Sequence, residues 1–438
     1  MLKVIRSHCS GIDIGSDKVF VSVSDEDVKI FDTFTDSFKE LVFYLQQHQV
    51  TSVAMEATGV YWYSLYEHLD GAHIEVCLVN GAHTKNVPGR KSDIQDCQWL
   101  HELHSYGLLR PSFIPDDLSR QLRAYTRLRD DHIGIGAMYI NQMQKALISM
   151  NIRLSQVISQ ITGVSGLRII EAILSGQRDP EQLAHLCVQQ IQSRKRTEVV
   201  RSLEGHYKEE YLFALSQALK AYKFAIEQRN ECDKQIENLL NEVTNGLPEV
   251  NIETCKSINM PQMPRHNTPN IEGLHQKLVT LTEGHDAAQI SGLTDASFMK
   301  LIAEVGTDLS KWATSAHFVS WLGLSPKIDA SNKKKKHRRR KSKPVAGQIF
   351  REAVQSLAKS KYLALGAFYR RIKARRGTLV ANVATARKLA IQYYNLMRFG
   401  VEFVETGIQQ YQHKYEQYIL QNSQRTVAKM GLKIVPID

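Results

Sequence analysis

The sequence predicts an α/β domain with a mixed sheet at the N-terminus, then a long helical region, then a mostly α-helical C-terminal domain. Residues 9–79 alternate β-branched runs with apolar residues at helical spacing. From Asp116 to about Asn245 the apolar spacing is helical, and helical segments return after a proline-rich stretch. We expect domains at 1–115, 116–250 and 272–407, a linker at 251–271 and a tail helix at 408–438.

The N-terminal domain is expected to begin with strands and to continue with alternating helices and strands. Asp36 or Ser37 is the expected cap of its first helix, and a second helix carries Tyr61. Ser92 or Asp93 is the expected start of a third helix. Strands followed by this alternation are typical of an α/β domain with a mixed sheet. The expected strands are 9–15, 18–24, 28–31, 52–56 and 74–79.

The middle region carries a seam of mostly apolar residues at alternating steps of four and three, broken only by Arg229. Such a seam predicts a coiled coil, and we expect it to join two copies of the chain. A helix packed in a bundle within one chain is the alternative, with the helical region 118–150 as its antiparallel partner. The seam consists of Tyr211, Leu215, Ala218, Tyr222, Ala225, Arg229, Cys232, Ile236, Leu239 and Val243.

The composition is that of a globular protein in a reducing compartment. The 438 residues, with 43% hydrophobic and 23% charged content, suffice for two or three domains. No apolar run approaches the roughly 20 residues that cross a bilayer, and the N-terminus lacks a signal-peptide pattern. The six cysteines are scattered without a Cys-x-x-Cys pair, which argues against a zinc site or a disulfide framework. We therefore expect a cytoplasmic protein with no membrane partner.

A dense basic run begins two residues after Ser331. Nine of the eleven residues 333–343 are Lys or Arg, whereas the whole chain has a net charge of +11, so the remainder is nearly neutral overall. A local field of this density suits polyphosphate. A disordered basic patch and a simple turn serine are the alternatives. The basic residues are Lys333, Lys334, Lys335, Lys336, Arg338, Arg339, Arg340, Lys341 and Lys343.

Four acidic residues stand out because of where they lie in the predicted strands and helix. Asp13 interrupts an apolar strand, and Glu56 ends another. Asp93 and Asp96 are three residues apart, so they project from one face of a helix start. Carboxylates gathered from two strands and a helix would suit Mg²⁺ or Mn²⁺, which prefer oxygen ligands. Spacing alone leaves open that Asp93 is a helix cap and Glu56 a solvated strand end.

A resemblance to a known family joins these features. Three N-terminal motifs look like the acidic tetrad of the DEDD transposases: Gly11-Ile-Asp13, Met55-Glu-Ala-Thr-Gly-Val-Tyr-Trp62 and Lys91-Ser-Asp-Ile-Gln-Asp96. These insertion-sequence recombinases are related to the Piv-type DNA invertases and have a RuvC-like (RNase H-like) catalytic domain. The C-terminal segments that resemble the family's second domain are 321–326, the serine five residues later, 349–354, 373–377 and 386–390.

The resemblance implies a composite active site and assigns roles to residues. It makes Ser331 the nucleophile, and Asp13, Glu56, Asp93 and Asp96 the ligands of Mg²⁺ or Mn²⁺. It also implies a RuvC-like N-terminal domain, a coiled-coil middle region and a C-terminal transposase domain. The chain departs from the family where Asn332, and not Gly, follows the serine. The nucleic-acid-binding residues are expected to be the nine basic residues above together with Arg351, Arg387 and Lys388.

The resemblance also implies partners. The expected partners are donor and target DNA, a structured guide (bridge) RNA, a second copy joined through the coiled coil, and a tetramer in the synaptic complex. The tetrad of one subunit would meet the serine of another, in a bacterial cytoplasm and on the nucleoid when DNA is bound.

Two other classes of function remain open on the sequence. One is a RuvC-like metal-dependent nuclease or Holliday-junction resolvase in which Ser331 is structural. The other is a coiled-coil protein that binds nucleic acid without catalysis. A phosphoserine intermediate would separate the first from a recombinase, because a serine ester conserves the energy of the phosphodiester for rejoining.

Overall fold

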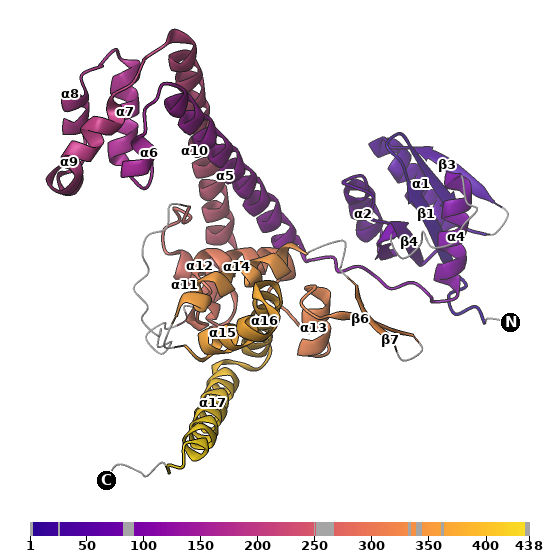
Figure 1. Cartoon of the computed structure of the whole chain (residues 1–438). Coiled ribbons are helices and arrows are strands. Elements are labelled where there is room, and N and C mark those ends of the chain that lie inside the picture. The colour runs from indigo at the N-terminus through magenta and orange to yellow at the C-terminus, as the bar shows by residue number, and fades with distance from the viewer. Residues whose placement is uncertain are drawn as a thin grey trace. The chain divides into compact units, whose positions relative to one another are not determined.

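The computed structural model describes residues 3–24, 27–81, 92–248, 250, 267–331, 334–338, 344–360 and 363–433 (Figure 1). Of the expected linker 251–271, residues 251–266 lie outside the described residues. The chain divides into two compact units, Met1–Ile114 and Pro115–Asp438. The first contains a small mixed sheet, and the second is mostly helical.

The first unit is built on a five-stranded sheet in the order β3-β2-β1-β4-β5. β1 pairs antiparallel with β2 and parallel with β4, β2 pairs antiparallel with β3, and β4 pairs parallel with β5. The mixed sheet predicted from the sequence is therefore present. The strands are β1 (Cys9–Ile14), β2 (Lys18–Ser22), β3 (Val28–Asp32), β4 (Ser52–Glu56) and β5 (Glu75–Val79).

Helices cover both faces of this sheet. α1 (Thr35–Gln47) and α2 (Trp62–Gly71) pack on one face, where Ile12 and Met55 share a core cluster with their apolar residues. α4 (Asp93–Ser105) packs on the other face, where its Leu100 clusters with Ala54 of β4. A mixed sheet between helices is consistent with an RNase H-like domain.

The helix starts test the expected caps. The cap expected at Asp36 or Ser37 is wrong: α1 begins at Thr35, and Phe34 is its extended N-cap without a side-chain hydrogen bond. The Asp36 carboxylate instead accepts a hydrogen bond from the Ser37 amide inside the first turn. The expected start at Ser92 is confirmed, because its hydroxyl accepts a hydrogen bond from the Gln95 amide.

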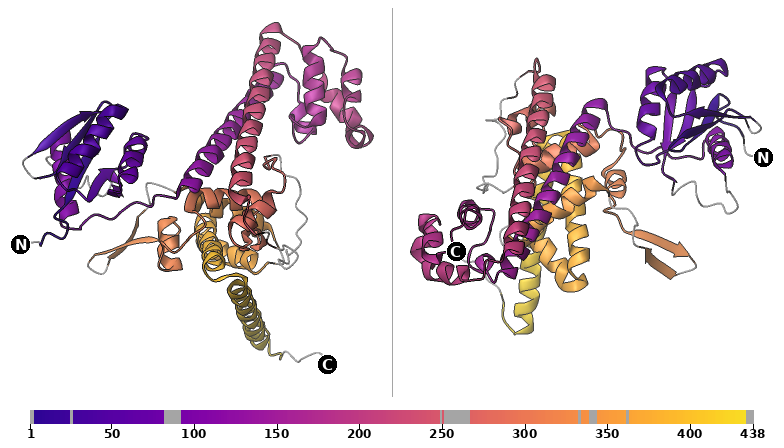
Figure 2. Two further views of the ribbon diagram at one scale, coloured as in Figure 1. Left: turned by 180° about the vertical axis from the view of Figure 1, so that it is seen from behind. Right: turned by 90° about the horizontal axis from the view of Figure 1, so that it is seen from above.

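Two long helices form the middle of the second unit. α5 (Asp117–Ser149) and α10 (Glu209–Thr244) run antiparallel beside each other (Figures 1 and 2). Most of the predicted seam on α10, from Leu215 to Leu239, is buried. Since α5 of the same chain covers it, the seam serves the within-chain alternative. Arg129 of α5 and Asp233 of α10 form a buried ion pair at this interface.

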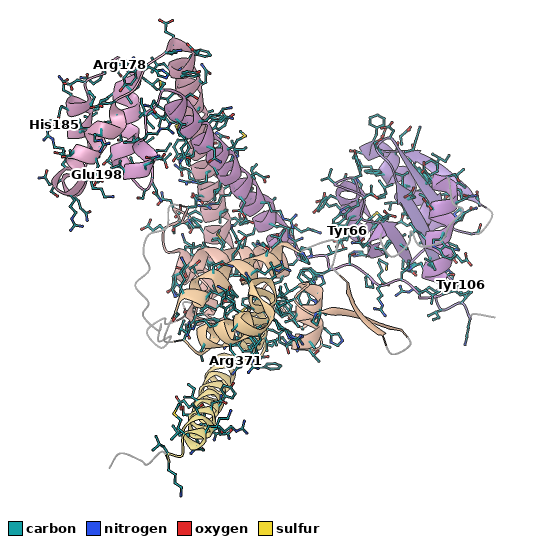
Figure 3. All side chains as sticks on the ribbon, viewed as in Figure 1. Tyr66, Tyr106, Arg178, His185, Glu198 and Arg371 are labelled. Carbon is teal, nitrogen blue, oxygen red and sulfur yellow. The ribbon has the colours of Figure 1, made fainter. Side chains whose placement is uncertain are left out.

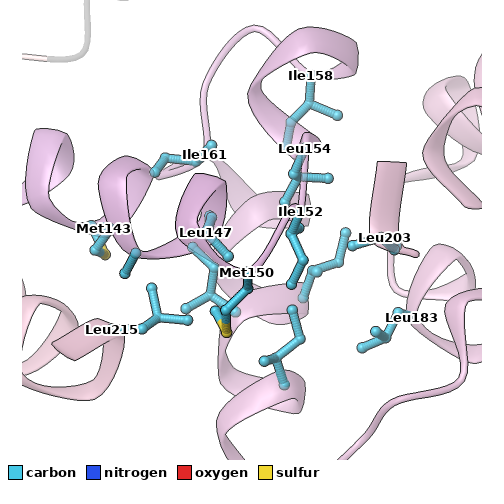
Figure 4. Packing of buried hydrophobic residues seen from close by; sticks show 14 of the residues in the cluster. Met143, Leu147, Met150, Ile152, Leu154, Ile158, Ile161, Leu183, Leu203 and Leu215 are labelled. Carbon is cyan, nitrogen blue, oxygen red and sulfur yellow. The ribbon is translucent and has the colours of Figure 1, made fainter. Parts of the chain in front are cut away.

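A lobe of four short helices caps the far end of α5 and α10. Its apolar side chains and those of Met143, Leu147 and Leu215 from the long helices form one core, so the lobe and the helical pair pack together (Figure 4). The sequence did not place these pieces. The helices are α6 (Leu154–Val157), α7 (Val164–Leu174), α8 (Pro180–His185) and α9 (Gln189–Leu203).

The C-terminal part is mostly helical, as predicted, but it also contains a β-hairpin that was not predicted. The hairpin consists of β6 (Lys327–Ser331) and β7 (Lys334–Arg338). The last helix begins at Val401, seven residues before the expected tail. The helices are α11 (Leu274–Leu281), η2 (Ala287–Gln289), α12 (Asp295–Val305), α13 (Ser315–Trp321), α14 (Val345–Lys359), α15 (Ala364–Arg376), α16 (Thr378–Phe399) and α17 (Val401–Lys429).

Charged contacts fix α12 against the start of α5. The Arg127 guanidinium donates to both oxygens of the Glu304 carboxylate, at 2.9 and 3.0 Å. Arg123 donates to the backbone oxygens of Ala303 and Glu304 at the end of α12. Such paired, partly buried contacts make the C-terminal helices and the long helical pair one body. Among the described residues, no helix is long and apolar enough to cross a membrane.

Candidate active site

Two of the predicted carboxylates lie at the same edge of the sheet. β1 and β4 are parallel neighbours in which Ile12 pairs with Met55, so Asp13 and Glu56 follow one residue later on adjacent strands. Ile12 and Met55 belong to the core under α1 and α2. Because side chains alternate along a strand, Asp13 and Glu56 point to the opposite face, which α4 covers.

The other two predicted carboxylates lie in the first turn of α4. Asp93 and Asp96 follow the Ser92 cap directly. α4 comes unusually close to β1 at Gly11, where an added Cβ would clash with the Cys97 carbonyl oxygen and stand 2.9 Å from the His101 Cα. The missing side chain thus lets the backbones of α4 and β1 touch, and this contact fixes the helix that carries Asp93 and Asp96.

The negative charges of the other three carboxylates act on Asp13. Burial is the largest cause that raises the pKa of Asp13, followed by the negative charges of Asp93, Asp96 and Glu56, and together they bring it to about 6. A hydrogen bond from the Ile14 amide opposes the rise. The structure therefore brings together carboxylates that are up to about 80 residues apart in the chain. A carboxyl raised in this way is destabilised in its charged form and is relieved by a proton or a cation.

Glu56 is held by the backbone that follows β5. Its carboxylate lies against Gly81, where an added Cβ would come within 2.7 Å of the Glu56 Cδ. A residue larger than glycine would displace this carboxylate. Residues 82–91, which include the predicted motif residue Lys91, lie outside the described residues.

The donor chemistry of these four residues fits a divalent cation. Carboxylate oxygens are the ligands that Mg²⁺ and Mn²⁺ prefer, and the raised pKa of Asp13 marks a site that lacks positive charge. The side chains do not converge on one point, because no group of three or more His, Cys, Asp or Glu among the described residues is placed to hold a metal ion. The fit is therefore one of chemistry and location, and ligation requires the carboxylates to draw together.

Ser331 lies in a strand, whereas the sequence alternative placed it in a turn. It is the last residue of β6 and pairs with Lys334, the first residue of β7. Residues 332 and 333, between the two strands, lie outside the described residues. Of the basic run, β7 contains Lys334, Lys335, Lys336 and Arg338, and the remaining members, Lys333, Arg339, Arg340, Lys341 and Lys343, lie outside the described residues.

The base of this hairpin is fixed by a close backbone contact. An added Cβ at Gly347 of α14 would clash with the Leu322 carbonyl oxygen, just after α13, and would stand 3.1 Å from its carbon. Leu322 precedes β6 and Gly347 follows β7 in the chain, so this contact joins the segments on either side of the hairpin. Arg351 lies one turn further along α14, where its guanidinium donates to the Gln348 side chain at 3.3 Å. Burial lowers the pKa of Arg351.

The last two predicted contact residues lie on α16. The Lys388 ammonium stands 5.0 Å from the centre of the Phe368 ring, and its pKa is lowered by burial and by the charge of Arg371. Arg387 is its half-exposed neighbour. The structure thus divides the predicted site residues between an acidic set in the first unit and a serine with basic residues in the second.

Comparison with known families identifies the class of protein. Residues 10–152 match the family model for the DEDD transposase of the IS110 type, described as a transposase, and residues 285–370 match the one described as transposase IS116/IS110/IS902 family. The two matches together cover more than half of the chain. No curated protein matches it.

The chain is a member of the IS110 family of DEDD-type transposases and recombinases. It is therefore an enzyme that acts on DNA, and membership in this family implies dependence on a divalent metal. The predicted resemblance is confirmed at this level.

Sequence reasoning missed the glycines that bring these parts together. A side chain at Gly81 would displace the Glu56 carboxylate, and one at Gly347 would clash with the Leu322 carbonyl oxygen. In a single sequence, a glycine that permits a close approach looks the same as a glycine in a loop, so no signal identified them.

Proposed function

We propose that this transposase cuts and rejoins DNA through a phosphoserine ester on Ser331, at a site completed by Asp13, Glu56, Asp93 and Asp96. The observation that carries the proposal is the pKa of Asp13, raised by burial and by the other three carboxylates. Four such groups on one sheet edge and one helix start would hold Mg²⁺ or Mn²⁺. When bound, the ion offsets phosphate charge and favours deprotonation of a hydroxyl.

The residues of the chain divide the chemistry between them. The Ser331 Oγ forms a bond to phosphorus while the bond from phosphorus to the departing strand oxygen breaks, and that oxygen leaves as a hydroxyl with a proton. A hydroxyl of a second DNA end then attacks the same phosphorus and releases Ser331. The number of phosphodiester bonds is conserved, so no ATP is needed. The basic residues of β7 and Arg351 position the phosphate.

We propose the same domain limits as above: 1–115 for catalysis, 116–250 for the helical region, a linker at 251–271, 272–407 for the serine domain and 408–438 for the tail. The catalytic domain is RuvC-like in this proposal. A guide RNA would read the DNA by base pairing, and the protein would contact backbones, including through Arg387 and Lys388. The nucleoid would be its place of action.

The proposed assembly is a dimer that pairs into a tetramer, with the carboxylates of one subunit and Ser331 of another in each site. Since the α10 seam packs on α5, pairing of two copies would use the outer face of α5. Leu128, Ile135 and Met138 lie there at heptad-like spacing and are 48%, 40% and 47% exposed. The Ile135→Glu variant should have a lower mass in solution than the wild type, and an unchanged mass would exclude this face.

One observation favours a second function, that of a RuvC-like nuclease or junction resolvase. Ser331 pairs with Lys334 in the hairpin ladder, and a serine with a purely structural role has the same place in a strand. In that case the carboxylates hydrolyse DNA and Ser331 takes no part.

Strand cleavage of duplex DNA in the presence of Mg²⁺ tests the proposal. Asp13→Asn, Glu56→Gln and excess chelator should each abolish cleavage, and Ser331→Ala should abolish it as well. Ser325→Ala removes a nearby hydroxyl and should leave cleavage intact. Normal cleavage by the Ser331→Ala variant would favour the nuclease, and normal cleavage by the Asp13→Asn variant would exclude both functions.

A further inference from the structure

The helices α15 and α16 carry positive charge without any acid. From Ala364 to Phe399 there are eight Lys and Arg residues and no Asp or Glu, and the flanking acids are Glu352 and Glu402. The whole chain has 45 acids in 438 residues, and this average would place about four in such a stretch. Outside residues 333–343 the chain is nearly neutral overall, but it contains this second positive region. The basic residues are Arg370, Arg371, Lys373, Arg375, Arg376, Arg387, Lys388 and Arg398.

Part of this charge is exposed at the end of α15. α15 and α16 pack against each other, and Leu365 and Tyr369 of α15 are buried. Lys373, Arg375 and Arg376, in the last turn of α15, are exposed. Within the described residues, none of the three forms an ion pair with a carboxylate. Basic residues in a last turn also stabilise the helix dipole, which accounts for a part of the pattern.

The helix dipole does not account for a second feature of this region. The Arg371 guanidinium lies 5.6 Å and the Lys388 ammonium 5.0 Å from the centre of the same Phe368 ring. Arg371 also lies 4.9 Å from the Tyr418 ring of α17, and Figure 3 labels it where the C-terminal helices meet α17. Two like charges are thus held beside one ring by two helices that contain no acid. An anion bound here would offset their repulsion.

We infer that this basic surface, made of Arg370, Arg371, Lys373, Arg375, Arg376 and Lys388, binds the phosphate backbone of double-stranded DNA, apart from the Ser331 hairpin. It rests on the proposed function in that DNA is the substrate. The rings of Phe368 and Tyr418 are engaged by cations, whereas surfaces for single strands present aromatic rings on which bases stack. The surface therefore suits the two backbones of a duplex and contributes affinity without sequence preference.

The test compares two variants with the same change of charge. The first replaces Lys373, Arg375 and Arg376 with Gln. The control replaces Arg168, Arg194 and Arg201 with Gln, which are exposed residues of α7 and α9 in the distal lobe. Both are made in the full-length Asp13→Asn protein, so binding is measured without cleavage. The probes are a duplex DNA of mixed sequence and a duplex RNA of equal length, titrated between about 50 and 200 mM salt.

The α15 variant should bind duplex DNA at least about tenfold more weakly, and its slope of log affinity against log salt should fall by about 2 to 3, as three lost phosphate contacts require. The control should shift both quantities much less. A charge-retaining variant, with Lys373→Arg, Arg375→Lys and Arg376→Lys, should restore the slope, which excludes a folding defect as the cause.

Two results would overturn the inference. One is equal loss in the α15 variant and the control, and the other is a loss confined to duplex RNA. These results are independent of the proposed chemistry, because the binding assay contains no cleavage step. Conversely, if Ser331 proves inert in cleavage, the predicted difference between the two variants stands unchanged.

Discussion

Asp13 and Ser331 are the two residues on which the proposed chemistry depends, and the fold holds them in different ways. Asp13 lies in the central strand of a five-stranded sheet, between two paired strands and under α4. Ser331 ends a strand of a two-stranded hairpin, and Leu322 and Gly347, before and after it in the chain, contact each other. The packed core of a domain therefore positions the carboxylates, whereas the serine lies in a two-stranded hairpin.

The carboxylates and the serine have different structural requirements. A site that must gather repelling charges needs a rigid frame, because the cost of the arrangement is met by the packing of the whole sheet. A nucleophile that attacks a DNA strand must in turn be reached by that strand, which is a different requirement. In both places a glycine makes a backbone contact that sets the position: Gly11 for α4 and Gly347 for the hairpin.

The largest effect is expected for Asp13→Asn. Loss of one metal-binding carboxylate should lower cleavage at least about a thousandfold, because a bound cation contributes several kcal/mol to such a transition state. The same change should raise the free energy of unfolding without metal by up to about 3 kcal/mol at neutral pH, since it removes a charge whose pKa is raised to about 6. Chemical denaturation with and without Mg²⁺ measures this free energy. If Mg²⁺ stabilised the variant as much as the wild type, the assignment of Asp13 as a metal ligand would be contradicted.

Gly11→Ala tests the rigid side of the comparison. The new Cβ would meet the Cys97 carbonyl and the backbone of His101, so α4 must shift or the domain must lose about 1 to 3 kcal/mol of stability. Displacement of Asp93 and Asp96 should lower cleavage about a hundredfold and weaken the Mg²⁺-dependent rise in Tm. Gly71→Ala, at the end of α2 with open space around it, is the matched control and should change neither. Wild-type Mg²⁺ stabilisation in Gly11→Ala would show that α4 does not position the site.

Gly347→Ala tests the hairpin side. An added methyl group at Leu322 should move the base of the hairpin and lower cleavage by up to about a hundredfold. The Mg²⁺-dependent rise in Tm should remain, because the carboxylates belong to the other compact unit. Loss of both responses would mean that the two regions are not independent.

A smaller effect concerns the pH dependence of stability. Burial lowers the pKa of His104 to about 4, and its Nε2 lies 3.0 Å from the Ser52 hydroxyl in the interface between α4 and the sheet. A histidine with a lowered folded pKa stabilises the protein above its unfolded pKa near 6.5, and this stability is lost as the pH falls towards 4. The raised pKa of Asp13 acts oppositely, with stability lost as the pH rises through about 6.

His104→Gln should therefore remove about 2 to 3 kcal/mol of the decline in stability between pH 6.5 and 4. Denaturant titrations over this range give the slope, and Asp13→Asn should change it in the other direction. An unchanged slope in His104→Gln would mean that the histidine titrates in the folded protein as it does in the unfolded chain.

The sequence predicted the parts of the molecule that follow periodic patterns. The β-branched runs around Asp13 and Glu56 lie in strands, and the α10 seam is buried, because alternation and heptad spacing are local properties of the chain. The hairpin was not predicted, because Lys334–Arg338 lacks the apolar alternation that marks a strand in a sequence. Its strand character depends on its pairing with Lys327–Ser331, which the sequence pattern does not report.

The sequence proposes which residues belong to the candidate site, but it does not show how the fold brings them near one another. Asp13 and Glu56 were found as acids in apolar strands, and Asp93 and Asp96 as a pair at a helix start. Their placement near one another depends on the Gly11 contact and on strand register, which no local pattern reports. The sequence also shows that α15 and α16 contain no Asp or Glu. The prediction of nucleic-acid contacts nevertheless relied mainly on the denser basic run after Ser331. The partner of the α10 seam was open for another reason, because a seam has the same spacing whether α5 or a second chain covers it.

The most direct test of the central claim is the identification of a covalent protein–DNA adduct. Wild-type protein is incubated with Mg²⁺ and duplex DNA spanning an end of its own element, quenched with denaturant, and digested for mass spectrometry of the nucleotide-bearing peptide. The account predicts a phosphodiester remnant on Ser331, present in Ser325→Ala and absent from both Ser331→Ala and Asp13→Asn. Cleaved DNA without any adduct, or an adduct on another residue, would contradict it.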